Sequence, residues 1–392
     1  MLNTKFSPWP SFSEAEVTAV AEVLRSNRVN YWTGDRCRDF EARFARWVGT
    51  EHAVALANGT LALDVALKAL DIGPGDEVIV TPRSFIASAS TVVNAGAVPV
   101  FADVDRNTQG LSAETIAKVL SPRTKAVIPV HLGGMPCDMD PIMELARERG
   151  LAVIEDCAQA HGATYKGRSV GSIGHIGAWS FCQDKIMTTG GEGGMVTTHD
   201  GALARKMWSY KDHGKDWDAV YTRKHPAGPR MVHESFGTNW RMLEMQAAIG
   251  LVQLDLMGEW VAKRNRNARQ IAASCASFAA VRVPDVPEHS THAYYRFYAF
   301  IDPERLASGW SRDRIIEEIN ACGVPCVHGS ASEVYLEKAF DGTGWRPAAR
   351  LPVARELGER SLCFLVHPTL TDLEVAQTSD AVRRILAEAT VS

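Results

Sequence analysis

The chain has 392 residues, of which 46% are hydrophobic and 22% are charged, and its formal net charge at pH 7 is -4. Such a chain can bury a large core and is long enough for two lobes, and its balanced charge gives no reason to expect nucleic-acid binding. No apolar run is long enough to cross a bilayer, so no membrane association is predicted. The N-terminus lacks the charged and apolar regions of a secretion signal, which predicts a cytoplasmic location.

The eight cysteines are scattered along the chain. Cys322 and Cys326 form the only near pair, and they lack a second pair or a suitable histidine partner for zinc. The sequence therefore predicts buried thiols and no metal site.

The first two thirds of the chain alternate between strand and helix patterns. Residues 1–12 are predicted to be an extended N-terminal arm, and the capping box Ser13–Glu16 predicts a helix to about residue 26. Strands are then predicted at 53–56, 77–80, 98–102, 126–129 and 151–155, with helices at 61–70, 113–120, 141–149 and 202–210. This alternation predicts an α/β fold with a mostly parallel sheet covered by helices.

The last third changes character after a long helical pattern from residue 242 to about residue 278. A helix of this length commonly connects two lobes, so we expect a large domain at 13–255 and a small C-terminal domain at 256–392. A strand at 293–301, a helix at 312–321 and a last helix from the capping box Thr371–Glu374 to about residue 388 predict an α+β lobe.

A lysine, Lys185, lies between two β-prone runs, Ala178–Phe181 and Met195–Val196. The glycine-rich run Thr188–Gly194 follows it, and its glycines permit a tight turn with close backbone approach. Most lysines are solvated surface charges, so this pattern alone favours an ordinary turn. The alternative is a Schiff-base lysine that points into a site.

A carboxylate upstream favours the second interpretation. The apolar strand Leu151–Ile154 is followed at once by Glu155 and Asp156. Ligands of open α/β sheets bind at the carboxyl ends of the strands, so Asp156 is placed where a ligand is expected.

A third motif, Asn58-Gly59-Thr60, joins a predicted strand to a predicted helix. A strand that turns through glycine into a helix presents free backbone N–H groups and the positive end of the helix dipole, which suits a phosphate. An Asn or Thr before a helix is more often only an N-cap, so this motif alone leaves both readings open.

In their order and spacing these three stretches resemble the pyridoxal-phosphate-dependent nucleotide-sugar aminotransferases of the DegT/DnrJ/EryC1 family. The resemblance continues through Gly237–Met242 to Leu362–Pro368. It implies the fold type I of aspartate aminotransferase, with a mostly parallel seven-stranded sheet in the large domain and a smaller C-terminal α+β domain. The cofactor it implies is pyridoxal 5'-phosphate, which passes through the pyridoxamine form during the cycle.

The resemblance also assigns roles around the cofactor ring. Lys185 would bind the cofactor covalently and carry a proton between substrate and cofactor, and Asp156 would hold the pyridine nitrogen in its protonated form. Gln159 would reach the phenolic oxygen of the ring. Phe85 would stack on the pyridine ring, although a phenylalanine in the core is an equally good reading of the residues alone.

Other roles implied by the resemblance concern the phosphate and the substrate. Gly59, Thr60 and Ser180 would hold the cofactor phosphate, and Asn239 would reach it from the other subunit, which requires a homodimer with composite active sites. His328 and Trp32 are the predicted substrate contacts. A structural role is expected for His161 and His213, and the polar stretch 211–230 is predicted to be a mobile loop bordering the site.

The function implied is transfer of an amino group from L-glutamate, which becomes 2-oxoglutarate, to a nucleoside-diphospho-4-keto-6-deoxyhexose in surface-polysaccharide, glycan or glycoside biosynthesis. The Thr188–Met195 run most resembles enzymes that act at C4. Three alternatives remain: a 3-keto sugar aminotransferase, a deoxysugar dehydratase using the same cofactor, and a non-catalytic regulator of the same fold. The dehydratase is disfavoured because those relatives replace the lysine with histidine, and this chain retains Lys185.

Overall fold

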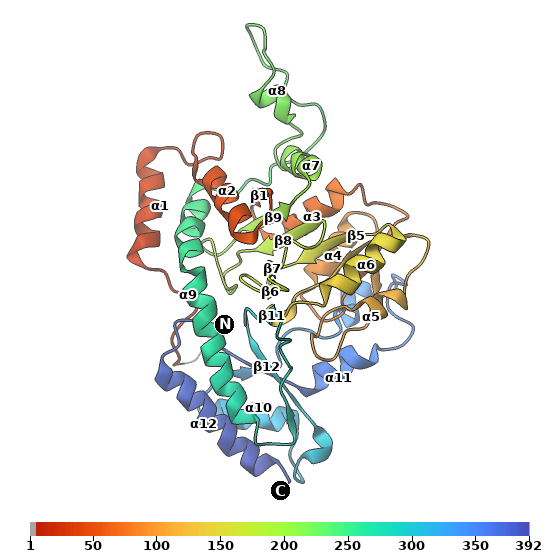
Figure 1. Cartoon of the computed structure of the whole chain (residues 1–392), viewed down its shortest axis with the longest axis vertical. Helices are drawn as coiled ribbons and strands as arrows, with labels where there is room; N and C mark the ends of the chain where they lie inside the picture. Colours follow the sequence, from red (N-terminus) through yellow and green to blue (C-terminus); the bar gives the residue numbers. More distant parts are fainter. Residues whose placement is uncertain (1–4, 392) are drawn as a thin grey trace.

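A seven-stranded sheet forms the centre of the larger lobe in the computed structural model, which describes residues 5–391 (Figure 1). Its strands lie in the order β1 (His52–Leu56), β9 (Gly194–Thr198), β8 (Ile176–Ser180), β5 (Ala152–Asp156), β4 (Thr124–Ile128), β2 (Glu77–Val80) and β3 (Val98–Phe101). Strand β9 is antiparallel to both neighbours, and the other pairings are parallel. The predicted α/β fold with a mostly parallel seven-stranded sheet is confirmed.

Helices cover both faces of this sheet, because successive strand residues point to opposite sides. Val78 and Val80 of β2 pack in a cluster with α3 (Gly59–Ala69), α4 (Ala87–Asn94) and α7 (Gly201–Lys211), whereas Ile79 packs on the opposite side. The second face is covered by α2 (Arg36–Val48), α5 (Ala113–Ala117), α6 (Met139–Arg149) and the first half of α9 (Glu244–Cys275). Strands buried on both faces explain the apolar runs in the sequence.

Helix α9 has 32 residues and extends along the molecule from the large lobe to the smaller one (Figure 1). Ala247, Leu254 and Met257 pack in the cluster of the large lobe that contains Trp179. Ala268 and Ile271, further along the same helix, pack in the core of the C-terminal lobe. Because the two halves belong to different cores, we propose that the boundary between the domains lies within α9, as the sequence predicts.

The C-terminal lobe contains a four-stranded antiparallel sheet in the order β10 (Val281–Arg282), β12 (Phe297–Ile301), β14 (Ser361–Phe364) and β13 (Cys326–Val327). Its helices are α10 (Arg312–Ala321), α11 (Pro352–Arg360) and α12 (Asp372–Ala389). Short 3-10 turns lie at Leu132–Gly134 in the large lobe and, after α9, at Pro303–Arg305, Val334–Leu336 and Lys338–Phe340. Helix α10 has the predicted bounds, and α12 begins at the predicted capping box of Thr371 and Glu374.

The strand predicted from residue 293 begins four residues later. The backbone N–H groups of Ala293 and Arg296 donate to the carbonyls of Gly134 and Gly133 in the large lobe, instead of to a neighbouring strand. A small three-stranded sheet, β11 (Ser290–Thr291), β6 (Thr164–Tyr165) and β7 (Arg168–Ser169), adds a second connection. The chain after α9 therefore returns to the large lobe before it enters the small one.

The N-terminal arm packs against both lobes. Ser7 donates through its hydroxyl to Glu374 at 2.9 Å, and the ring of Trp9 lies edge-on to Trp260 with centroids 5.1 Å apart. Helix α1 (Glu14–Ser26) follows, with the predicted capping box at Ser13. The first four residues of the predicted arm lie outside the described part of the chain.

Residues 212–241, here called the projecting arm, leave the end of α7 and extend away from the sheet (Figure 1). The arm contains α8 (Trp217–Tyr221), which the sequence did not predict. Trp217 packs against Trp208, with ring centroids 4.9 Å apart, and so attaches α8 to the body. No helix in the described residues is long and apolar enough to span a membrane.

Candidate active site

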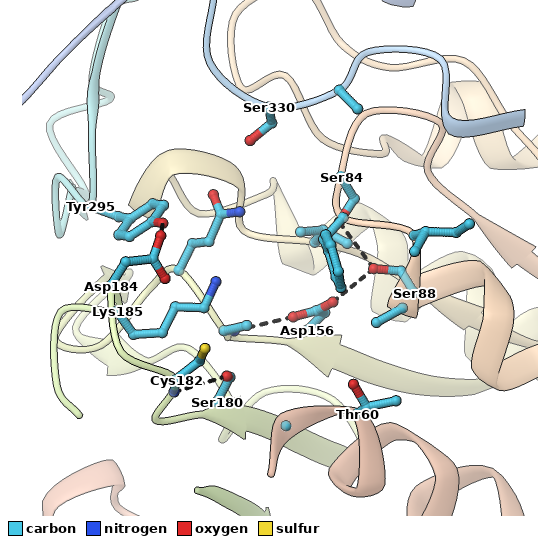
Figure 2. Close-up of a pocket in the computed structure, with 18 of the residues that line it drawn as sticks. Thr60, Ser84, Ser88, Asp156, Ser180, Cys182, Asp184, Lys185, Tyr295 and Ser330 are labelled. Atoms are coloured by element: carbon cyan, nitrogen blue, oxygen red, sulfur yellow. Dashed lines mark hydrogen bonds between the residues drawn. The ribbon is translucent and has the colours of Figure 1, made fainter. Parts of the chain in front are cut away.

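A cavity of about 1020 Å³ opens between the large lobe and the C-terminal lobe. The large lobe contributes the carboxyl ends of β5 and β8 and the first turn of α3, and the small lobe contributes Tyr295–Arg296 and Gly329–Ala331 (Figure 2). The cavity brings together seven residues singled out from the sequence: Gly59, Thr60, Phe85, Asp156, Gln159, Ser180 and Lys185.

Lys185 lies in the loop between β8 and β9, and its side chain enters the cavity (Figure 2). Two hydrogen bonds hold its backbone: its N–H donates to the carbonyl of Cys182 at 3.0 Å, and its carbonyl accepts from the indole of Trp9 at 2.8 Å. Its Nζ lies 5.1 Å from the centroid of the Tyr295 ring. The amine is thus presented to the cavity from a fixed backbone, which suits a group that must reach a reacting carbon.

Asp156 ends strand β5 and is almost completely buried at the floor of the cavity. Its Oδ2 accepts from the hydroxyl of Ser88 at 2.9 Å, and its Oδ1 accepts from the backbone N–H of Ala158 at 3.1 Å. Burial raises the pKa of the Asp156 carboxyl, and these hydrogen bonds partly offset that rise. A cationic ring nitrogen beside Asp156 would favour the ionised form.

Ser88 was not singled out from the sequence. It lies on α4, and its hydroxyl is 3.0 Å from that of Ser84, which precedes the helix (Figure 2). The signal that could have revealed it is the four-residue spacing of two serines after β2, since residues i and i+4 meet on one side of a helical turn. Ser88 also lines the cavity, and its hydroxyl orients the carboxylate of Asp156.

The first turn of α3 touches the end of β8. A β-carbon built on Gly59 would lie 2.4 Å from Cβ of Ser180, so only glycine fits there. Asn58 caps the helix, because its Oδ1 accepts from the N–H of Leu61 at 3.0 Å. The cap leaves the first two helical N–H groups, those of Gly59 and Thr60, beside the Ser180 hydroxyl. Both readings of the motif therefore hold, since an N-cap and a set of donors suited to a phosphate coexist.

Phe85 and Gln159 line the cavity beside Asp156. The Phe85 side chain is 69% exposed and faces the cavity, so the alternative of a core phenylalanine is wrong. The Oε1 of Gln159 accepts from the N–H of Gly133 at 2.7 Å. That bond orients the amide with its NH₂ group available as a donor.

These groups fit pyridoxal phosphate. They supply an exposed aromatic face, a buried carboxylate and a lysine directed into the same cavity. They also supply donors suited to a phosphate, in a space that a side chain at Gly59 would obstruct. When bound, the cofactor provides an electron sink that amino-acid side chains lack. In that case Asp156 would face the ring nitrogen, the donors at Gly59, Thr60 and Ser180 would hold the phosphate, and the Lys185 amine would carry a proton.

Several predicted residues lie outside the cavity of their own chain. The Nε2 atom of His328 lies 3.2 Å from Oδ1 of Asp313 on α10, so its ring, 59% exposed, points away while Val327 and Gly329 line the wall. The structure therefore does not place His328 where it could contact a substrate in this cavity.

Trp32 is also absent from the cavity wall. Its ring packs against Trp208 and Tyr221 at the base of the projecting arm, and the Nζ of Lys215 lies 3.9 Å from its centroid. None of residues 211–230 lines the cavity of the same chain, contrary to the predicted loop at its border. Asn239 lies at the base of the same arm, bridged to Asp212, and its role in a second subunit stays a prediction.

The histidines and thiols near the site differ in how deeply they are buried. His161 is fully buried between Trp179 and Phe181, and burial lowers its pKa to about 3, which suits a neutral core residue. His213 lies at the start of the projecting arm and does not line the cavity. The prediction of buried thiols has two exceptions, because Cys182 and Cys322 are partly exposed. Cys182 lines the cavity.

A buried cluster of His131, Glu155 and Cys157 lies directly behind Asp156, with potential ligand atoms within 4.8 Å of one another. The Nδ1 of His131 accepts from the N–H of Cys137, and its Nε2 lies 3.0 Å from Glu155. Burial raises the pKa of Cys157 to about 12, which favours the thiol. These atoms are engaged with one another and with the backbone, so the cluster supports β5 as a hydrogen-bonded network.

Comparison with known proteins agrees with this geometry. The sequence matches the DegT/DnrJ/EryC1/StrS aminotransferase family over residues 10–383. The crystal structure of an aminotransferase from Psychrobacter cryohalolentis is 63% identical, covers 97% of this chain and 99% of its own, and superposes with a TM-score of 0.96.

Two curated relatives are named for their reactions. GDP-perosamine synthase of Caulobacter vibrioides is 39% identical over 89% of each chain. UDP-N-acetyl-3-dehydro-alpha-D-glucosamine 3-aminotransferase of Acidithiobacillus ferrooxidans is 35% identical over 94% of this chain and 93% of its own. With its lysine, carboxylate and phosphate donors in one cavity, the chain belongs to the DegT/DnrJ/EryC1/StrS aminotransferase family and is a pyridoxal-phosphate-dependent aminotransferase.

Proposed function

We propose that this enzyme transfers an amino group from L-glutamate to the C4 keto group of a nucleoside-diphospho-4-keto-6-deoxyhexose. The volume of the cavity is the observation that supports a nucleotide-linked substrate. At about 1020 Å³ it is at the upper end of small-molecule sites, which span roughly 300–1,000 Å³. The cofactor would occupy the part around Asp156 and Gly59, which would leave room for a second large ligand toward Ser330 on the small lobe.

The relatives support a nucleotide-linked sugar, because one is named for a GDP-linked product and another for a UDP-linked substrate. They differ in the nucleotide, so the nucleotide of this enzyme does not follow from them. The choice of C4 rests on the Thr188–Met195 run after the lysine. The 3-aminotransferase relative favours amination at C3 as the second candidate.

We also propose a homodimer with composite sites. Among the described residues that line the cavity, Lys185 and Arg296 are the only cations, against the acidic side chains of Asp156, Asp184, Glu192 and Glu337. A cofactor phosphate and a substrate diphosphate need more positive charge or more donors than this. Asn239 and the exposed cations of the projecting arm, which face away from their own cavity, are available to a second copy.

The substrate test is to incubate the enzyme with glutamate and a panel of UDP-, dTDP- and GDP-linked 4-keto and 3-keto sugars. The readouts are 2-oxoglutarate formation and product mass. We expect a 4-amino sugar to form from at least one 4-keto substrate. Activity confined to 3-keto sugars would show that the second candidate is right, and activity only on free amino acids and oxo acids would rule out a sugar substrate.

A further inference from the structure

Arg296 faces the cavity from the C-terminal lobe and has no role in the site described so far. It immediately precedes β12, and its backbone N–H donates to Gly133 of the large lobe. Its side chain is 22% exposed and forms part of the cavity wall. The residue is therefore fixed at the junction of the lobes, with its guanidinium open to a ligand.

The donors of this guanidinium are largely unfilled. Its ion-pair partner among the described residues is Asp184, and the Nη2–Oδ2 distance of 3.8 Å is too long for a hydrogen bond. Asp184 instead accepts a hydrogen bond from the hydroxyl of Tyr295. Arginine carries five N–H donors and stays charged at any working pH, so an anion is the ligand that would use them.

The same aromatic ring positions Arg296 and the reactive lysine. The Cζ atom of Arg296 lies 4.9 Å from the centroid of the Tyr295 ring, and the Nζ atom of Lys185 lies 5.1 Å from it. Stacking on an aromatic face fixes the plane of a guanidinium, and with it the direction of its paired donors. Arg296 and Lys185 also line the same cavity, so an anion bound by Arg296 would share that cavity with the amine of Lys185.

We propose that Arg296 binds the α-carboxylate of the amino-acid donor, which deepens the proposed function and rests on it for the identity of the donor. In an amino acid the carboxylate is attached to the carbon that bears the reacting nitrogen. In a nucleotide-linked sugar the nearest phosphorus is at least four bonds from the carbon that is aminated. Arg296 packs against the same Tyr295 ring as Lys185, so it is placed to bind the carboxylate. Arginine–carboxylate pairs are commonly bidentate.

Asp184 fits this assignment. The same space must accept a charged donor and then a sugar ring without a carboxylate, and between the two Arg296 would be an uncompensated, largely buried cation. The Asp184 carboxylate lies near enough to compensate that charge without occupying the guanidinium donors. The pair therefore allows the space beside Arg296 to accept first a carboxylate and then an uncharged sugar ring.

The test uses the holoenzyme and two unreactive probes. Glutarate has the carboxylates of the donor without its amine, and UDP has the diphosphate of a sugar substrate without the sugar. Calorimetry measures the dissociation constant of each probe for the wild type, for Arg296→Gln, and for Arg305→Gln as a matched control. Arg305 is an exposed arginine of the same lobe that pairs with Asp302 outside the cavity.

Loss of a hydrogen-bonded charge should weaken glutarate binding by Arg296→Gln at least about tenfold and leave UDP binding within about twofold. The glutamate half-reaction, followed by loss of the cofactor's yellow colour, should show the same increase in apparent dissociation constant, with a smaller change in the limiting rate. Arg305→Gln should match the wild type in both assays.

Unchanged glutarate binding in Arg296→Gln would overturn the inference, and so would weakening of UDP alone or of both probes equally. These outcomes differ from failure of the proposed donor. If glutamate is not the donor, the wild type itself will neither bind glutarate nor lose its colour with glutamate. Failure of the proposed sugar would leave all of these measurements unaffected, because none of them uses a sugar.

Discussion

Gly59 and Ser180 come from segments 121 positions apart in the sequence, and a β-carbon on Gly59 would lie 2.4 Å from that of Ser180. The first turn of α3 and the end of β8 therefore form one surface. The helical N–H groups and the serine hydroxyl converge there because no side chain stands between them. The proposed phosphate site consequently depends on the absence of a side chain at Gly59.

Gly59→Ala should weaken pyridoxal phosphate binding at least about tenfold, because overpacking of this kind costs about 1–3 kcal/mol and forces the helix turn away from Ser180. Equilibrium dialysis or cofactor absorbance measures the effect. Gly258→Ala is the matched control, since Gly258 lies on α9 with open space around it and should tolerate alanine. Equal cofactor affinity in the two variants would contradict the described packing.

Asp156→Asn should lower kcat/KM by at least about a hundredfold, because an amide cannot stabilise a protonated ring nitrogen as a carboxylate does. Ser88→Ala should lower it by only about tenfold, through loss of one hydrogen bond that orients Asp156. Steady-state kinetics on both variants tests whether Asp156→Asn loses more kcat/KM than Ser88→Ala. Normal turnover in Asp156→Asn would remove the proposed role of the carboxylate, and a Ser88→Ala loss as large as that of Asp156→Asn would contradict an indirect role.

Structural features that are set by neighbouring residues could be predicted from the sequence. Features that are set by contacts with distant parts of the chain could not. Helix α10 has its predicted bounds because a capping serine and apolar spacing act within a few residues. The loop before β12 was predicted as strand, because its alternation is that of a strand and its hydrogen bonds to Gly133 and Gly134 join two lobes. Arg296 was overlooked for the same reason.

The candidate site shows the same division. The sequence identifies Lys185, Asp156 and Gly59 because each lies in a short motif whose neighbouring residues indicate its chemistry. The structure brings the three residues into one cavity. His328 is adjacent in sequence to cavity residues, but its ring contacts Asp313 on α10 and points away from the cavity. Proximity along the chain identifies the segment that lines a cavity, whereas the direction of a side chain depends on partners that no local pattern reveals.

Glu155 should contribute to the acid sensitivity of the fold. Burial would raise the pKa of this carboxyl, but hydrogen bonds from His131, Gly171 and Gly174 outweigh burial and lower it. A lowered pKa in the folded state means stability that is present above the unfolded value of about 4.3 and lost as the pH falls through the folded pKa. Glu155→Gln should therefore cost about 2–3 kcal/mol at pH 7 and less at low pH.

Thermal melting of both proteins between pH 7 and pH 3.5 measures this dependence. The gap between the melting temperatures of wild type and Glu155→Gln should narrow as the pH falls. A constant gap, or one that widens toward acid, would mean that Glu155 is not an ionised hydrogen-bond acceptor in the folded protein.

Mixing two inactive variants tests the composite site. If Asn239 acts across a dimer interface, subunits carrying Lys185→Ala and subunits carrying Asn239→Ala will form heterodimers with one intact site. Random exchange of equal amounts should then restore about a quarter of wild-type activity. If Asn239 acts on its own subunit, or if the protein is a monomer by sedimentation, no activity will return on mixing.

The most direct measurement follows the two half-reactions in one cuvette. The yellow enzyme is first treated with glutamate, freed of small molecules, and then mixed with a nucleoside-diphospho-4-keto-6-deoxyhexose. We expect the yellow absorbance to be lost with glutamate and to return with the keto sugar, with one amino sugar formed per active site. Lys185→Ala should show neither change. An enzyme whose colour is restored by 2-oxoglutarate but by no nucleotide-linked keto sugar would contradict a sugar as the amino-group acceptor.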